Sequence, residues 1–106
     1  MADQILLAIS TFPDAETANR IAQTLVEEKL AACANLIPAV HSIYRWKEKI
    51  EAASEVMVFF KTTQDRLEAF DEKLRSLHPY EVPELLSVKI DGGSRDYLRW
   101  VIDNCG

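Results

Sequence analysis

Glycine is scarce in this chain, with only three among 106 residues, and proline is almost as sparse, with four. A glycine motif of the Rossmann or P-loop type is absent, and so is any Ser/His/Asp or Cys/His set with a known local signature. No low-complexity tract or repeat of solenoid period is present. No catalytic template therefore fits, and we expect an ordinary globular protein that is not an enzyme.

An excess of basic charge and long apolar runs are also lacking. The chain has 12 Lys and Arg against 17 Asp and Glu, which gives a net charge of −5. An acidic surface repels phosphate backbones and offers no basic footprint for DNA or RNA. The apolar stretches are only a few residues long, far below membrane-spanning length. We expect a cytoplasmic protein that has neither nucleic acid nor membrane as a partner.

Only two cysteines are present, Cys33 and Cys105. They could form one bridge at most, and we expect reduced thiols rather than a disulfide framework. Cys33 is either a thiolate ligand or, more simply, a small buried residue. With 106 residues, the chain is long enough for one hydrophobic core but too short for two. The sequence therefore predicts a single domain over residues 1–106.

The first third of the chain predicts a strand followed by a helix. The apolar run 5–9 is typical of a strand buried on both faces. Asp14 is a suitable N-cap because its carboxylate can accept free backbone N–H groups of a first helical turn. Apolar residues then recur three and four apart over 15–30, which predicts an amphipathic helix.

The middle third predicts one long β-hairpin. Two β-rich runs, 34–46 and 50–62, flank the charged residues Lys47-Glu48-Lys49. Each arm of about 13 residues would extend about 43 Å, more than twice a typical strand. Such a hairpin should project beyond its own core, where exposed apolar side chains favour coverage by another chain. Pro38 cannot donate to a ladder and predicts an edge or bulge in the first arm.

The last third predicts a helix, a short strand and a terminal helix. Leu67, Phe70, Leu74 and Leu77 form a helical stripe that Pro79 ends, and a strand is expected over 85–90. The order β-α-β-β-α-β with a short C-terminal helix predicts an α+β, ferredoxin-like sandwich with a long central hairpin.

Several motifs, taken together and in this order, resemble the CutA family of divalent-ion tolerance proteins over nearly the whole chain. They are Leu30-Ala-Ala-Cys-Ala-Asn-Leu-Ile-Pro38, Ser42-Ile-Tyr-Arg-Trp46 with Lys49-Ile-Glu51, Lys61-Thr-Thr63, His78-Pro-Tyr80 with Pro83-Glu84, and Asp96-Tyr-Leu98 with Trp100. The resemblance implies a ferredoxin-like subunit that assembles as a homotrimer through its long hairpin. It also implies a role in tolerance of copper and other divalent cations.

The resemblance carries over unevenly to metal ligands. The copper site of some family members uses a Cys at the end of the first strand and two adjacent His before the Pro-Tyr motif. Ser10, Leu77 and His78 occupy these positions here. A hydroxyl and an isobutyl group do not replace a thiolate and an imidazole for copper, so His78 is the one candidate metal ligand. The family usually has Gly in the hairpin turn, where this chain has Glu48, so the turn must avoid a left-handed conformation or bear strain.

A second group of residues predicts a ligand-facing cleft at a subunit boundary, since it combines aromatic walls with a cation, a carboxylate and an imidazole. Its members are Tyr44, Trp46, Lys61, His78, Tyr80 and Glu84. The alternative is that Tyr44 and Trp46 hold subunits together while Lys61 and Glu84 form an ion pair.

Two functions follow as hypotheses. The first is a cytoplasmic homotrimer that contributes to tolerance of copper and other divalent cations by binding rather than turnover. The second is a trimeric sensor or partner-binding module with a small ligand in its inter-subunit clefts, which resembles PII signalling proteins in architecture only.

Overall fold

The sheet of this chain is antiparallel and has the strand order β2-β3-β1-β4. The computed structural model describes residues 4–106, so the first three residues of the predicted 1–106 domain lie outside the described residues. The strands are β1 (Ile5–Phe12), β2 (Cys33–Trp46), β3 (Lys49–Thr63) and β4 (Leu86–Lys89). β1 pairs with both β3 and β4, which agrees with the strand predicted at 5–9, although it continues to Phe12.

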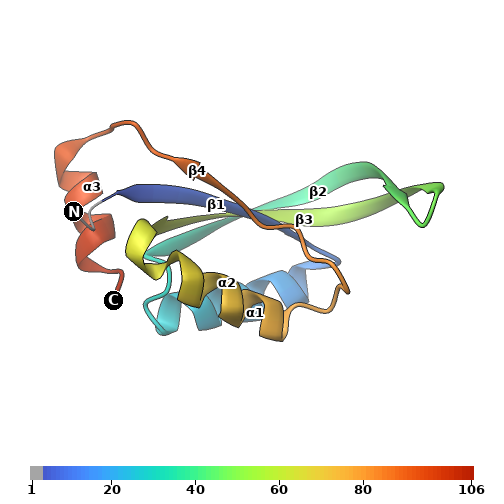
Figure 1. Ribbon diagram of the computed structural model, residues 1–106, viewed down its shortest axis with the longest axis horizontal. Coiled ribbons are helices and arrows are strands. Elements are labelled where there is room, and N and C mark those ends of the chain that lie inside the picture. The colour runs from blue at the N-terminus through green and yellow to red at the C-terminus, as the bar shows by residue number, and fades with distance from the viewer. Residues whose placement is uncertain (1–3) are drawn as a thin grey trace.

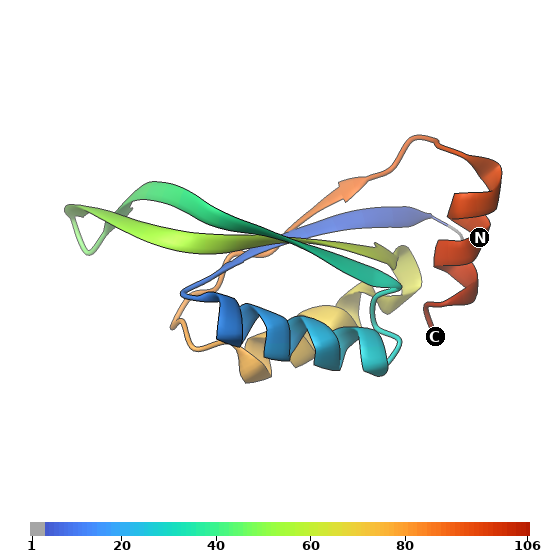
Figure 2. The same ribbon diagram turned by 180° about the vertical axis from the view of Figure 1, so that it is seen from behind.

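The helices lie where the sequence predicts them. They are α1 (Ala15–Glu27), α2 (Leu67–Leu77) with the preceding 3-10 helix η1 (Gln64–Arg66), and α3 (Arg95–Asp103). The observed order confirms the predicted α+β, ferredoxin-like plan with its terminal helix. α1 and α2 lie side by side on one face of the sheet, and α3 stands at the end away from the hairpin tip (Figures 1 and 2). No helix within residues 4–106 is long and apolar enough to cross a membrane.

The start of α1 is as predicted, but its end is not. The Oδ1 atom of Asp14 accepts the Thr17 backbone N–H at 2.8 Å and so caps the helix. The helix was predicted over 15–30 and ends at Glu27, because Lys29 adopts a left-handed conformation with φ of 58°. Leu30 nevertheless remains buried beyond the helix. Apolar spacing predicts burial, and it cannot detect the left-handed residue that ends the helix.

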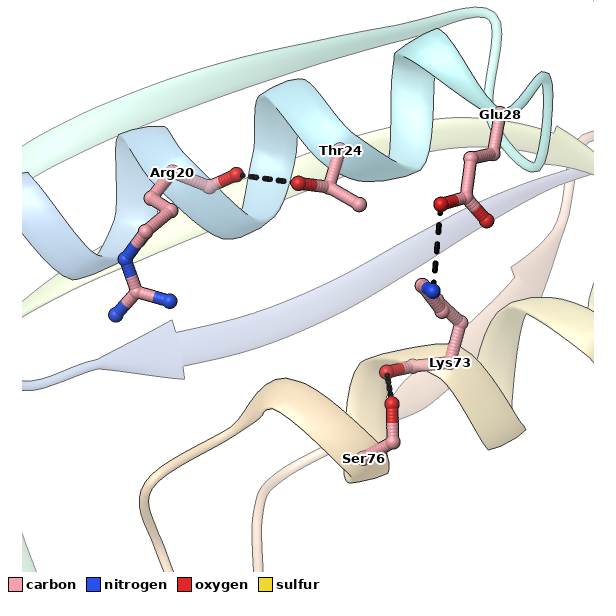
Figure 3. Close-up of polar contacts among 5 residues, drawn as sticks. All are labelled: Arg20, Thr24, Glu28, Lys73 and Ser76. Atoms are coloured by element: carbon pink, nitrogen blue, oxygen red, sulfur yellow. Dashed lines mark hydrogen bonds and ion pairs between the residues drawn. The ribbon is translucent and has the colours of Figure 1, made fainter.

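The core lies between the sheet and the two long helices. Alternate residues of β3, Val56, Val58 and Phe60, pack under these helices with Phe70 of α2. Phe60 and Phe70 meet edge to face at 5.0 Å, a favourable geometry for aromatic rings. An ion pair also joins the helices, with Lys73 Nζ 3.3 Å from Glu28 Oε2, as Figure 3 shows. Both side chains are partly exposed, so this pair contributes only about 0–1 kcal/mol and the apolar core is the main link.

The hairpin of β2 and β3 projects beyond the helix-covered part of the sheet (Figure 1). The molecule extends 44 Å along its longest axis against 25 and 22 Å along the others. The register shifts between Ile37 and Val40, so a bulge lies where Pro38 predicts one, and Ala39 there has φ of 62°. Lys47 and Glu48 form the tip, and both have positive φ, 51° and 68°. The turn therefore is left-handed and bears the strain that the absence of Gly predicts.

Candidate functional site

His78 follows α2 directly, and its ring is held on both sides. Pro79 forces its backbone out of the helical region, so α2 ends and the ring turns towards β1. Nε2 lies 2.7 Å from the Thr11 carbonyl oxygen, and Nδ1 accepts the Tyr80 backbone N–H at 3.2 Å. A nitrogen that accepts carries no proton, so Nε2 is the donor and the ring is neutral.

The surroundings of this ring are apolar. It stacks on Phe12 with 4.7 Å between centroids and is 8% exposed. Burial lowers the pKa of His78, while the bond to the Thr11 carbonyl and the charge of Glu55 act in the opposite direction. Through its bond to Thr11 and its stacking on Phe12, His78 thus holds the connector, residues 78–85, against the end of β1.

Tyr80 makes the second bond of this region. Its hydroxyl donates to Glu55 Oε2 at 2.6 Å, and Glu55 is 9% exposed on β3. Burial raises the pKa of Tyr80 well above its ordinary value, and the bond to the Glu55 carboxylate raises it further. Asp14 and Tyr44 add smaller electrostatic effects in the same direction. His78, Tyr80 and Glu55 therefore form one cluster, which we call the connector cluster.

Lys61 lies away from the connector cluster, near the C-terminal end of β3. It pairs with Leu7 on β1 and with Cys33 on β2, six residues along the strand from Glu55. At about 3.3 Å per residue, this separation is about 20 Å. Lys61 Nζ donates to Asn35 Oδ1. The Cys33 sulfur in turn lies 3.5 Å from the Tyr97 hydroxyl on α3.

The remaining predicted residues occupy the hairpin and the connector. Tyr44 and Trp46 lie on the outer part of β2 and are 44% and 38% exposed. Lys47 Nζ stands 5.6 Å from the centroid of the Trp46 ring, a cation–π contact within the hairpin tip. Glu84 is half-buried in the connector. Across residues 4–106, none of the ion pairs joins it to Lys61.

Within one chain, the structure brings together only part of the predicted set. His78 and Tyr80 meet, with Tyr44 close enough to influence Tyr80. Lys61 lies near the end of β3, whereas Trp46 of β2 pairs with Lys49 at the start of β3. Sequence reasoning missed Glu55 and Asn35. A charged or amide residue in a strand normally faces solvent. No local signal in the sequence shows that Tyr80 donates to Glu55 or that Lys61 donates to Asn35.

The family can now be assigned from comparison with known proteins. The model of the CutA1 divalent ion tolerance protein family matches residues 6–104. The chain belongs to this family. It is 41% identical over 100 residues to the divalent-cation tolerance protein CutA of Thermus thermophilus, covering 94% of this chain and 97% of that one. A Xenopus laevis CutA homolog is 48% identical over 96 residues, which is 91% of this chain but 64% of that protein.

The fold comparison agrees with this assignment. The crystal structure of CutA1 from Oryza sativa superposes with a TM-score of 0.96 at 32% identity, covering 99% of this chain and 96% of that one. Some CutA relatives are longer than this chain, as the Xenopus protein shows. The shared part is therefore the ferredoxin-like domain described above.

The copper-site positions implied by the CutA resemblance do not fit copper in this chain. The Ser10 side chain is fully buried, and its Oγ has no hydrogen-bond partner within the described residues. Leu77 packs against the core. Both ring nitrogens of His78 are already engaged, so a metal ion would have to displace one of its bonds. In the part of the chain from residue 4 onward, no group of three His, Cys, Asp or Glu side chains could hold a metal.

Proposed function

We propose that this CutA chain is the subunit of a cytoplasmic homotrimer that contributes to divalent-cation tolerance, including copper, by binding rather than by turnover. The family assignment supports the tolerance role. The single structural observation that supports assembly is a large apolar surface that the chain's own helices leave uncovered. The number three comes from the CutA resemblance, and the surface gives the physical reason for association.

This surface has two parts. The first is the sheet face opposite α1 and α2, which we call the open face. Its apolar side chains, placed by strand register, are Leu7, Ile9, Ile37, Met57, Phe59, Leu86 and Val88. The second is the projecting hairpin, where Ile43 and Ile50 are 68% and 63% exposed. Exposed apolar surface of this kind is typical of an interface, and closed symmetry lets identical copies cover one another.

The proposed ligand clefts lie between subunits. Trp46 and Lys61 are separated along the sheet of one chain, so only a neighbouring hairpin could bring all six predicted cleft residues around one ligand. Aromatic side chains are enriched at such interfaces, which is consistent with both packing and ligand roles for Tyr44 and Trp46.

The assembly is tested by measuring mass. We expect sedimentation equilibrium to give three times the chain mass of 12.0 kDa at micromolar concentration. Ile43→Lys should shift the protein towards monomer, because it places a charge in the interface. Val82→Lys is the matched control, since Val82 is also 68% exposed but lies in the connector. A monomeric wild-type protein would remove the assembly from the proposal.

Cation binding is tested separately by isothermal titration with Cu²⁺ and Zn²⁺. The sequence proposes His78 as a ligand, which requires its ring to release either Tyr80 or Thr11. His78→Ala should then weaken binding, while His41→Ala, at an exposed position, should not. Equal titrations of the wild-type protein and His78→Ala would exclude His78 as a ligand.

The second function is a sensor for a small organic ligand. It is favoured because both ring nitrogens of His78 are engaged, which leaves neither free for a metal, and because the rings of Phe12 and Tyr80 lie beside it. A metabolite screen by thermal shift separates the two functions, since a ligand at 100 times its dissociation constant stabilises the folded state by about 2.7 kcal/mol. Stabilisation by a metabolite without an effect of cations would support the sensor. Stabilisation by cations alone would support the metal-binding role.

A further inference from the structure

A donor-rich group of side chains lies at the α3 end of the open face, away from the connector cluster. Cys33 and Asn35 of β2 and Lys61 of β3 share this face by their register. Tyr97 of α3 reaches the same place, with its hydroxyl 3.5 Å from the Cys33 sulfur. Cys33 and Lys61 are half-buried, and Asn35 is exposed. The group is therefore assembled from three elements and remains accessible on one side in the chain.

The hydrogen bonds of this group leave donors free. Lys61 Nζ has three N–H donors, and one is directed to Asn35 Oδ1. Because the Asn35 amide oxygen is the acceptor in this bond, its NH₂ group points its two donors elsewhere. No other protein acceptor for these N–H groups occurs within residues 4–106. The bond also orients the ammonium, which lowers the entropy cost of binding an acceptor there.

An aromatic surface borders these donors. Tyr97 stacks on Trp100 with 5.7 Å between ring centroids and 26° between planes, and each is 43% exposed. The bond to Cys33, followed by burial, raises the pKa of Tyr97 to about 12, so its hydroxyl keeps its proton at neutral pH. The site thus combines one cation, neutral donors and a flat apolar surface.

We propose that Lys61, Asn35, Tyr97 and Trp100 form a binding site for a planar organic oxyanion, a carboxylate or phosphate attached to an aromatic ring. The oxyanion accepts hydrogen bonds from Lys61 and Asn35, and the ring lies against Tyr97 and Trp100. This site is separate from the proposed cation binding, because it selects negative charge and uses neither His78 nor Glu55. It shares Lys61 with the predicted inter-subunit cleft and so rests on the second proposed function, the sensor for a small organic ligand.

The test is a titration of the ¹⁵N-labelled full chain with benzoate and with phenyl phosphate, and with benzamide as the neutral control. The exposed side-chain amide of Asn19 on α1, which lies on the other side of the sheet, is an internal control for the signals of Trp100 and Asn35. We expect the Trp100 indole and the Asn35 side-chain amide to shift together with one saturable dissociation constant. The Asn19 side-chain amide should not move with them. Tighter binding of benzoate identifies a carboxylate site, and tighter binding of phenyl phosphate identifies a phosphate site.

Two variants sharpen the result. Lys61→Met should weaken benzoate binding at least about tenfold, because charge-assisted hydrogen bonds are the strong ones. Lys49→Met is the control, an exposed lysine on the hairpin. If Lys61→Met does not fold, as judged by circular dichroism, Asn35→Asp tests the same donors by replacing them with a carboxylate. Equal affinity for benzamide, unchanged binding by the variant used, or no saturable shift with either anion overturns the proposal.

Discussion

Two neighbouring phenylalanines of β3 show how differently the two faces of this sheet are built. Phe60 is fully buried beneath α1 and α2 and contacts Phe70. Phe59, one residue earlier, points to the open face and is only half-buried. The composition of the two faces is similarly apolar, yet only one of them is covered by this chain. The helix-covered face therefore stabilises the subunit, whereas the open face is available for association.

The largest expected effect tests this contrast directly. Phe60→Ala should lower the free energy of unfolding by about 3–5 kcal/mol, because it leaves a cavity in a closed core. Phe59→Ala should cost clearly less in dilute protein, since less area is withdrawn from water. Urea unfolding of both variants at one concentration measures the difference. Equal losses would show that the faces are not energetically distinct.

A smaller effect is expected where the connector reaches the open face. By register Glu55 belongs to that face, and it is buried with Tyr80 as its hydrogen-bond donor. Tyr80→Phe should cost about 1–3 kcal/mol, because a buried carboxylate loses its donor. Tyr44→Phe, an exposed tyrosine, should change stability by less than about 0.5 kcal/mol. Chemical unfolding checks both, and a neutral Tyr80→Phe would remove the pair from the stabilising contacts.

The pH dependence should also separate the connector from the hairpin. Since the pKa of His78 is lowered from 6.5 in the folded protein, its contribution is complete above pH 6.5. It is lost as the pH falls from there towards the lowered value, because the unfolded chain takes up a proton that the folded ring does not. Urea midpoints of the wild-type protein should therefore fall more steeply from pH 7 to 5 than those of His78→Gln. His41→Gln, on the exposed hairpin, should keep the wild-type slope; a wild-type slope in His78→Gln would contradict this assignment.

The smallest expected effect lies at the hairpin tip, beyond the part of the sheet that α1 and α2 cover. Glu48→Gly should stabilise the protein by about 1 kcal/mol, because relief of left-handed strain exceeds the added entropy cost of glycine. Glu51→Gly, in a regular strand, should instead destabilise by about 0.5–1 kcal/mol. Thermal unfolding compares the two. Destabilisation by both glycines would show that the tip is not strained.

Much of the fold could be predicted because local patterns have local physical causes. Pro79 ends α2 and Pro38 marks the bulge, since the ring of proline restricts its neighbour and removes a donor. The hairpin length follows from the spacing of the β-rich runs. The end of α1 could not be predicted in this way, because Leu30 continues the apolar stripe beyond a left-handed Lys29.

The candidate site was predictable only in part. His78 and Tyr80 belong to one short motif, so their proximity follows from the sequence. Lys61 carries the right chemistry for a cleft, but its observed neighbours are Asn35 and Cys33 rather than His78 or Glu84. The type of a residue indicates which interactions its side chain can make. It does not indicate which side chains of neighbouring strands lie beside it on the same face of the sheet.

The order of elements, the long hairpin and the family could therefore be predicted from the residues alone, because periodicity, proline chemistry and ordered motifs are properties of neighbouring residues. The contacts of Tyr80 with Glu55 and of Cys33 with Tyr97 join residues 25 and 64 positions apart and became visible only in the folded chain. Those contacts depend on the path of the connector and on where α3 packs. The packing of distant segments sets both, and no local pattern encodes it.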